Sequence, residues 1–261
     1  MQYAIGPDGA KIEAAKGRRA VCAICGGACA PKCGSIRIHH WAHVAGMECD
    51  PWWEPETEWH RAWKALFRPE FVEVAKGPHR ADIANERIVV ELQNSPISPE
   101  EIAAREAFYG SIIWIVNAAG FSDRFFLTRL MGNGVFAFRW KQMKPSWLRA
   151  KRPVYLDFGH TTVSDLRGAR YTSASVPLGD EGDEKSFDRK TVVRYRGGGT
   201  VYGERSAYTP HESLANLTAW QLARTILRVN TMYASGAGSA IPVEREAMLK
   251  SHGLDPFLTF N

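Results

Sequence analysis

The sequence of 261 residues has no apolar run long enough to cross a membrane, because a membrane-spanning helix needs about 20 predominantly apolar residues. Its first residues, Met1–Gly6, carry neither the basic segment nor the apolar segment of a secretory signal peptide. The chain also has no internal repeat and no low-complexity tract, which excludes repeat architectures and extended disorder. We therefore expect a cytoplasmic protein without a membrane partner.

Cysteine is scarce, with five residues in the chain, and four of them fall between Cys22 and Cys33. An odd, clustered set of this kind favours thiols in a reducing compartment over a disulfide framework. The segment from Cys22 to Cys49 is also too short and too polar to build a hydrophobic core. A bound metal ion would supply the stability that burial cannot.

The composition provides enough apolar material for a core, since 45% of the residues are hydrophobic. The charge balance is mildly basic, with a net charge of +5 and a pI of about 9.0. Such a balance is compatible with a nucleic-acid partner but does not establish one. The function must therefore be argued from the motifs.

Hydrophobic periodicity predicts an α/β core in the order helix, three strands, helix, strand. The first helix is expected over 55–67, with Pro55 at its first position and apolar residues recurring at helical spacing from Trp59 to Leu66. The second helix is expected from a capping box at 98–101 to Tyr109. Strands are expected at 71–74, 80–84, 87–93 and 112–116, after an N-terminal hairpin at 3–14. The crossover makes the last two strands of the core a parallel pair.

Beyond residue 118 the patterns are weaker. We expect a helix at 122–131, strands at 135–140 and 153–158, a solvated loop at 178–190, and a helix from Thr209 to about Tyr233. The predicted segments are a hairpin and Cys/His module at 1–53, the core with its sheet extension at 54–175, and an α+β extension at 176–261. The extension has no assigned chemistry and offers a surface for a second copy or a protein partner.

The hairpin of the core carries three residues suited to a catalytic site. With a two-residue loop at 85–86, Asp82 pairs with Val89 and lies diagonal to Glu91 on one face, which Gln93 shares. The two carboxylates then have Cβ atoms about 7–8 Å apart. At that spacing they can converge on Mg²⁺, which activates water and neutralises a phosphodiester.

Spacing alone leaves an alternative, in which Arg80 and Glu91 form a cross-strand ion pair on an exposed face while Asp82 is solvated. The preceding helix favours the catalytic interpretation. It presents a polar stripe at i, i+4 and i+8, formed by Glu56, His60 and Lys64. When the apolar side packs on the sheet, we expect this stripe to lie along the rim.

Several motifs occur in an order that resembles the competence protein CoiA-like family, over about residues 1–117. They are Cys22-x-x-Cys25, His40-Trp41-Ala42-His43, Glu56-Thr57-x-x-His60-x-x-x-Lys64, Arg80-Ala81-Asp82-Ile83 and Val90-Glu91-Leu92-Gln93-x-Ser95. The family is regarded as having a PD-(D/E)XK, restriction-endonuclease-like core of αβββαβ order, with a mixed sheet flanked by helices. The setting that it implies is bacterial or phage, in competence, replication or defence.

The resemblance implies a Mg²⁺-dependent (or Mn²⁺-dependent) deoxyribonuclease with DNA as its partner, whose metal is held by Asp82 and Glu91. His60 would be an additional metal-side residue supported by Glu56. Gln93 stands where the superfamily usually has lysine, and glutamine cannot supply positive charge. We assign that charge to Lys64. The alternative function is a non-catalytic nucleic-acid-binding or processing accessory protein on a degenerate nuclease scaffold.

The Cys/His segment predicts a structural zinc site, for which Cys22-x-x-Cys25 is one half. On the family pattern the ligand set is Cys22, Cys25, His43 and Cys49, with His40 as the replacement. Three alternatives remain open: a Cys₄ set with Cys29 and Cys33, a finger ending at His39 and His43, and free thiols. A separate alternative is a ββα-metal nuclease centred on His39 and His40.

Overall fold

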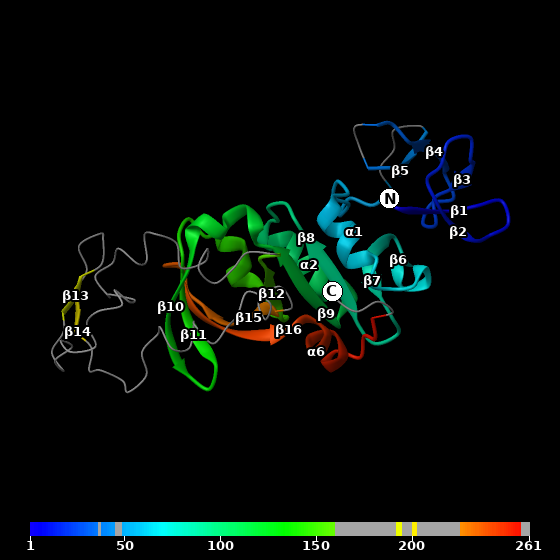
Figure 1. Cartoon of the computed structure of the whole chain (residues 1–261). Coiled ribbons are helices and arrows are strands. Elements are labelled where there is room, and N and C mark those ends of the chain that lie inside the picture. The colour runs from blue at the N-terminus through cyan, green and yellow to red at the C-terminus, as the bar shows by residue number, and fades with distance from the viewer. Residues whose placement is uncertain (36–37, 45–48, 160–191, 195–199, 203–224, 257–261) are drawn as a thin grey trace. The chain divides into compact units, whose positions relative to one another are not determined.

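The computed structural model describes residues 1–35, 38–44, 49–159, 192–194, 200–202 and 225–256 (Figure 1). The fold is α/β, with a mixed sheet and few helices. The chain divides into two compact units, which are described separately. The first comprises Met1–Val116, Lys151–Pro153 and Glu246–Asn261, and the second comprises Asn117–Ala150 and Val154–Arg245. The division into segments at 1–53, 54–175 and 176–261 that the sequence suggested stays a prediction.

The first unit begins with a small antiparallel sheet in the order β2-β1-β3-β4-β5. Its strands are β1 (Tyr3–Ile5), β2 (Lys11–Glu13), β3 (Ala20–Val21), β4 (Ala28–Lys32) and β5 (His40–His43). The predicted N-terminal hairpin is β1–β2. Among the described residues, the buried core under this sheet consists of Ala4, Ala14, Ala20, Cys22, Cys29 and Trp41. So small a core cannot hold the segment by burial alone.

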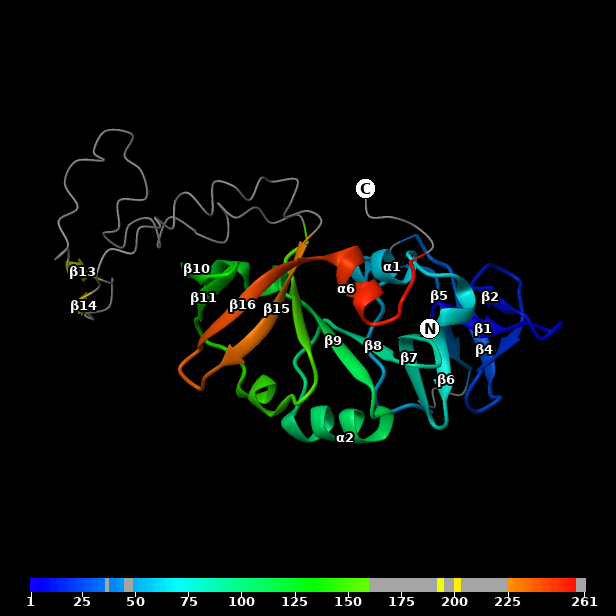
Figure 2. The same ribbon diagram turned by 90° about the horizontal axis from the view of Figure 1, so that it is seen from below.

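The rest of the first unit follows the predicted order of helix, three strands, helix and strand. The elements are α1 (Glu58–Lys64), β6 (Val72–Lys76), β7 (His79–Ala84), β8 (Val89–Gln93), α2 (Pro99–Tyr109) and β9 (Ile112–Asn117). Strands β6, β7 and β8 are antiparallel neighbours, while β8 and β9 are parallel. Helix α2 covers one face of these strands, and α1 and α6 (Arg245–Ser251) cover the other (Figure 2). The apolar run of β9 is buried on both sides, as predicted.

Local signals at the helix ends explain where each helix starts. Helix α2 starts at Pro99, because the Ser98 side chain accepts the backbone N–H of Glu101. Helix α1 starts at Glu58 instead of Pro55, because Thr57 and His60 form a reciprocal capping box. Glu56 therefore lies before the helix and not on its face. The predicted start at Pro55 is wrong by three residues.

The hairpin between β7 and β8 differs in register from the prediction. Ala84 pairs with Val89, and Ile83 pairs with Val90. The loop is therefore four residues long. It is stabilised by the Asn85 side chain, which accepts the backbone N–H groups of Arg87 and Ile88. A shift of two residues keeps each side chain on its predicted face, since strand side chains alternate with a period of two.

The second unit holds an antiparallel sheet in the order β10-β11-β16-β15-β12. Its strands are β10 (Phe125–Gly132), β11 (Val135–Trp140), β12 (Val154–Asp157), β15 (Thr225–Met232) and β16 (Ala237–Glu244). The predicted strands at 135–140 and 153–158 are found. The helix predicted at 122–131 is wrong, because this segment is a 3₁₀ helix followed by β10. Pairing of β10 with β11 overrides the local spacing of Phe125, Phe126 and Leu130.

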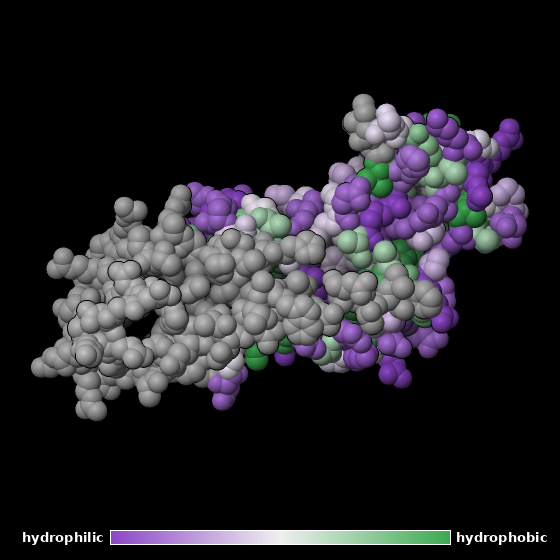
Figure 3. Space-filling model, in the orientation of Figure 1, coloured by the Kyte–Doolittle hydropathy of each residue, from purple (hydrophilic) through white to green (hydrophobic). Residues whose placement is uncertain are grey.

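The predicted helix from Thr209 to Tyr233 is also wrong in its last part, where β15 pairs with β16. Its earlier part, and the loop predicted at 178–190, lie outside the described residues. The short strands β13 (Val192–Arg194) and β14 (Thr200–Tyr202) pair with each other. Within the described ranges, no helix is long and apolar enough to span a membrane. The described surface is mostly hydrophilic on the face that Figure 3 shows, with apolar residues scattered over it.

Candidate functional site

Four metal-ligand side chains come together in the N-terminal sheet of the first unit. The ligand atoms of Cys22, Cys25, His43 and Cys49, hereafter the thiol cluster, all lie within 4.8 Å of one another. The Sγ atoms of Cys22 and Cys49 are 3.6 Å apart, and Cys25 Sγ is 3.3 Å from His43 Nε2. Sulfur ligands of tetrahedral zinc lie about 3.8 Å apart, given a Zn–S bond near 2.3 Å. The cluster can therefore bind a metal such as zinc.

The loop from Cys22 to Gly27 shapes one half of the thiol cluster. The backbone N–H groups of Ile24 and Gly27 point at the sulfurs of Cys22 and Cys25, each at 3.4 Å. The turn closes through Gly26, whose φ of +69° is costly for a residue with a side chain. Amide donors of this kind favour the thiolate form, which is the metal ligand.

The charge of the thiol cluster also favours a cation. Burial and the sulfurs of Cys22 and Cys25 raise the pKa of the Cys49 thiol to about 12. Without a cation, several thiolates so close together would repel one another. A divalent ion would replace the thiol protons and neutralise the group.

Among the described residues, none of the alternative ligands for the second half of the zinc site lies in the thiol cluster. His40 directs Nδ1 at the carbonyl oxygen of Ile38, 2.8 Å away. Cys29 is buried and donates to the carbonyl of Gly27, while Cys33 and His39 lie outside the thiol cluster. The structure therefore contradicts the choice of His40, the Cys₄ set and the finger ending at His39. The alternative of a nuclease centred on His39 and His40 stays a prediction.

A second site is a polar cavity of about 30 Å³ between α1, β7 and β8, which has room for a water molecule or a small cation. Its polar lining is Glu54, Glu56, His60, Lys64, Glu73, Arg80, Asp82, Glu91 and Arg105, hereafter the carboxylate cavity. It includes five of the six predicted catalytic residues. Gln93 is the sixth and is not part of the lining.

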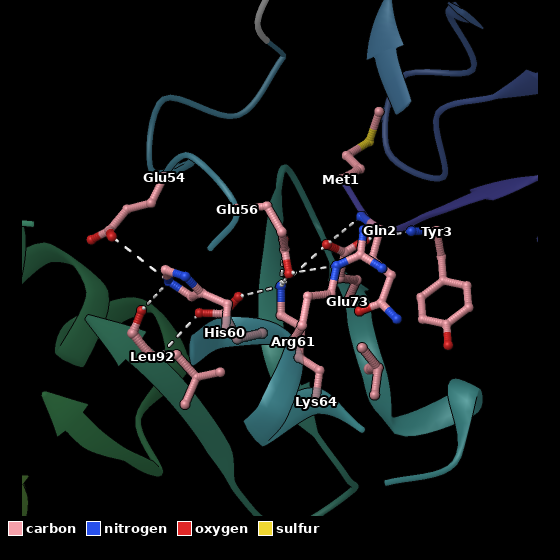
Figure 4. Close-up of polar contacts among 12 residues, drawn as sticks. Met1, Gln2, Tyr3, Glu54, Glu56, His60, Arg61, Lys64, Glu73 and Leu92 are labelled. Atoms are coloured by element: carbon pink, nitrogen blue, oxygen red, sulfur yellow. Dashed lines mark hydrogen bonds and ion pairs between the residues drawn. The ribbon is translucent and has the colours of Figure 1, made fainter. Parts of the chain in front are cut away.

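Lys64 lies at the centre of this cavity and is 3% exposed (Figure 4). Its Nζ lies 3.0 Å from Asp82, 3.1 Å from Glu56 and 3.2 Å from Glu73. Burial alone would lower the pKa of Lys64, but the three carboxylates raise it well above its usual value. Lys64 is therefore a permanent positive charge beside Asp82 and cannot serve as a base.

Asp82 and Glu91 lie in the same cavity but differ in charge state. Burial would raise the pKa of Asp82, yet Lys64, together with a 3.0 Å hydrogen bond from the Leu92 N–H, lowers it. Burial and the charge of Asp82 raise the pKa of Glu91 to about 8, although Arg105 donates to its Oε2 at 2.5 Å. The other oxygen, Glu91 Oε1, is buried and has no hydrogen-bond partner among the described residues. A buried carboxyl oxygen of this kind is costly to leave unsatisfied.

His60 is held from both sides of its ring. Its Nε2 lies 3.2 Å from the carbonyl oxygen of Leu92, so this nitrogen carries the proton and donates. Its Nδ1 accepts from the Thr57 hydroxyl at 2.8 Å. Both ring nitrogens are therefore engaged in positioning α1 against β8. His60 would have to break one of these bonds to reach a metal.

Gln93 forms a hydrogen bond with Glu54, a residue that the sequence pattern did not indicate. The side-chain amide of Gln93 donates to Glu54 Oε1 and to the carbonyl of Ser95. The backbone N–H groups of Asn94 and Ser95 donate to Glu54 Oε2, each at 3.2 Å. Burial raises the pKa of Glu54 despite these donors. Gln93 thus holds the carboxyl group of Glu54 at the cavity.

The polar stripe of α1 lies in the interior, which differs from the expected position along the rim. His60 and Lys64 are only 2% and 3% exposed. Three further residues of the cavity, Glu54, Glu73 and Arg105, were missed because each lies on a different segment, away from any motif. The local signal for Glu73 was its place as an acidic residue within the strand predicted at 71–74.

In comparisons with models of protein families, with curated proteins and with solved structures, no match to this chain was found.

Proposed function

We propose that the carboxylate cavity is the active site of a metal-dependent nuclease that hydrolyses DNA phosphodiester bonds. The observation that carries this proposal is Glu91 Oε1, a buried carboxyl oxygen without a partner, beside the ionised Asp82. Two carboxyl groups, one of which has an oxygen without a hydrogen bond, are suitable ligands for a divalent cation. The element order from α1 to β9, with its parallel β8–β9 pair, supports a PD-(D/E)XK-type core.

Asp82 and Glu91 would hold Mg²⁺ or Mn²⁺. Among the described residues, no third carboxyl group or histidine gathers with them as the ligands of the thiol cluster do. This fits magnesium, which commonly binds one or two protein carboxylates and completes its shell with water and substrate phosphate. When bound, the ion would polarise the phosphate and lower the pKa of a water molecule.

The other residues of the cavity have distinct roles in this proposal. Lys64 supplies the positive charge that Gln93 lacks, because it lies 3.0 Å from Asp82 and stays protonated. Glu54, with a raised pKa, is placed to accept a proton from the attacking water. Gln93 orients Glu54, while His60 fixes α1 against β8. Glu56 holds Lys64 and Arg61 in place.

The test is cleavage of single- and double-stranded DNA and of RNA with Mg²⁺, with Mn²⁺ and with EDTA. We expect Asp82→Asn and Glu91→Gln each to lower cleavage at least about a hundredfold, since each removes a negative ligand of the ion. The matched control is Glu106→Gln, because Glu106 is also a buried carboxylate but holds the backbone of Lys151 and Arg152. Undiminished cleavage by both cavity variants would reject the site.

A second candidate function is nucleic-acid binding without catalysis. The observation in its favour is that Lys64 and Arg105 already contact Asp82 and Glu91, so the charges of the cavity are partly balanced without an ion. Salt-sensitive DNA binding without any metal-dependent cleavage would support this function.

A further inference from the structure

Glu73 combines a strained backbone with complete burial of its carboxylate. It lies in β6 with a φ of +50° and is 3% exposed. A residue with a side chain holds this left-handed conformation only where surrounding contacts impose it. The register of β6 with β7 is regular on both sides of it, with Val72 opposite Ile83 and Val74 opposite Ala81. The strain is therefore confined to one residue.

The carboxylate of Glu73 joins two parts of the first unit. Its Oε1 accepts the backbone N–H of Gln2 at 2.9 Å and lies 3.2 Å from Lys64 Nζ, while its Oε2 accepts the N–H of Tyr3 at 2.9 Å (Figure 4). One side chain thus bonds the start of β1 and the central cation of the carboxylate cavity. Lys11 of β2 adds to this link by donating to the carbonyl of Val72 at 2.6 Å.

Strand β1 and Met1, on its N-terminal side, are bonded in turn to segments that carry ligands of the thiol cluster. Ile5 pairs with Val21, which directly precedes Cys22. The N–H of Trp41 donates to the carbonyl of Met1 at 2.9 Å, and Trp41 lies two residues before His43 on β5. The small core leaves these strands dependent on the metal ligands for their order.

We infer that Glu73 is a positioning residue, which fixes Lys64 against Asp82 and makes that pair depend on metal binding in the thiol cluster. The argument rests on the proposed function for the role of Lys64, but the link itself is a property of the fold. When the thiol cluster loses its ion, β1 loosens, Glu73 loses two of its donors, and Lys64 is no longer held at one position. The thiol cluster would then control whether the carboxylate cavity is formed.

The experiment is labelling of the full chain with a small amine-reactive ester, read at individual lysines by peptide mass spectrometry. No cleavage activity is needed, so failure of the proposed function leaves this test intact. In the zinc-loaded protein we expect Lys64 to be protected relative to Lys250, which is an exposed lysine. Removing zinc with a chelator should raise labelling of Lys64 several-fold, because its amine is then no longer enclosed by Glu56, Glu73 and Asp82. Returning zinc should reverse it.

The variant Glu73→Gln should expose Lys64 to labelling even with zinc bound, and it should lower the pH at which Lys64 becomes reactive. Lys76 is the internal control, because it lies on the same strand as Glu73 and donates to the backbone carbonyl of Asn85, which the substitution retains. Glu106→Gln is the matched control, since it weakens an equally buried carboxylate that does not touch Lys64. If Glu73→Gln does not fold, Cys22→Ser in place of the chelator provides the metal-free state.

Two results would overturn the inference. One is unchanged labelling of Lys64 after metal analysis has shown the thiol cluster to be empty. The other is a Glu73→Gln protein whose Lys64 keeps the protection and the pH profile of the natural chain. A parallel rise at Lys76 and Lys64 would also count against it, because it would indicate general loosening and not loss of positioning.

Discussion

The thiol cluster and the carboxylate cavity lie in the same unit and use opposite ways to hold charge. In the thiol cluster, four ligands converge within 4.8 Å without a positive side chain among them. In the carboxylate cavity, the acidic groups are interleaved with two cations: Lys64 contacts three of these groups, and Arg105 contacts Glu91. The first arrangement has no cation of its own, whereas the second is partly balanced by its two cations and leaves Glu91 Oε1 without a hydrogen bond from any described residue.

Because of this difference, a metal ion would have a different role in the thiol cluster from its role in the carboxylate cavity. Zinc at the thiol cluster would be structural, because four protein ligands close its coordination shell. An ion at the carboxylate cavity would have two carboxylates and open positions, which is what catalysis requires. The following predictions test that contrast.

The largest effect is expected from loss of the ion of the thiol cluster. Cys22→Ser, or chelation, should unfold the N-terminal sheet, because structural zinc contributes of order 10 kcal/mol to folding of a small module. Zinc content should fall from one ion per chain to none, and hydrogen exchange should become fast over β1–β5. Cys33→Ser is the control, since Cys33 is outside the thiol cluster. An unchanged exchange pattern in metal-free protein would show that burial suffices.

The next effect concerns Lys64. Lys64→Met leaves three carboxylates without their shared cation, and breaking a buried ion pair in this way typically costs about 3–5 kcal/mol. Hydrogen exchange of β6–β8 in increasing urea measures this free energy of opening. The exposed pair of Arg124 with Asp123 is the comparison, for which Arg124→Met should cost less than about 1 kcal/mol. Similar losses in the two variants would contradict the central role of Lys64.

The smallest effect is a pH dependence caused by Glu91. Its pKa is about 8 in the fold, above the ordinary value of 4.5. Between these values the folded state holds the extra proton, so the stability from this group is fully present at low pH and is lost as pH rises toward 8. Mg²⁺ binds the ionised form and should therefore raise the melting temperature more at about pH 8.5 than at about pH 6.

Glu91→Gln should remove this pH dependence of the Mg²⁺ effect, while Glu106→Gln should retain it. An equal shift of the melting temperature by Mg²⁺ at both pH values would mean that Glu91 does not bind the ion. The measurement needs zinc present throughout, so that the thiol cluster stays loaded.

The sequence by itself determined the features that depend on local patterns. The Cys-x-x-Cys spacing indicated one half of the thiol cluster, whereas His43 and Cys49 were expected only from the resemblance to a family. The order of elements from α1 to β9 followed from capping residues and from the two periods of hydrophobic residues. Alternation along β7 and β8 also placed Asp82 and Glu91 together, although the register was wrong by two residues.

Tertiary structure alone decided the environment of each charge. Glu54, Glu73 and Arg105 come from separate segments, and only folding brings them to Lys64 and Glu91. The same applies to β10 and β15, whose residues have helix-compatible spacing until neighbouring strands pair with them. Desolvation and charge proximity depend on distances between segments far apart in sequence. For this reason the raised pKa of Glu91 and the burial of the polar stripe depend on the fold. The sequence provides the residues involved, but it does not show how they are placed relative to one another.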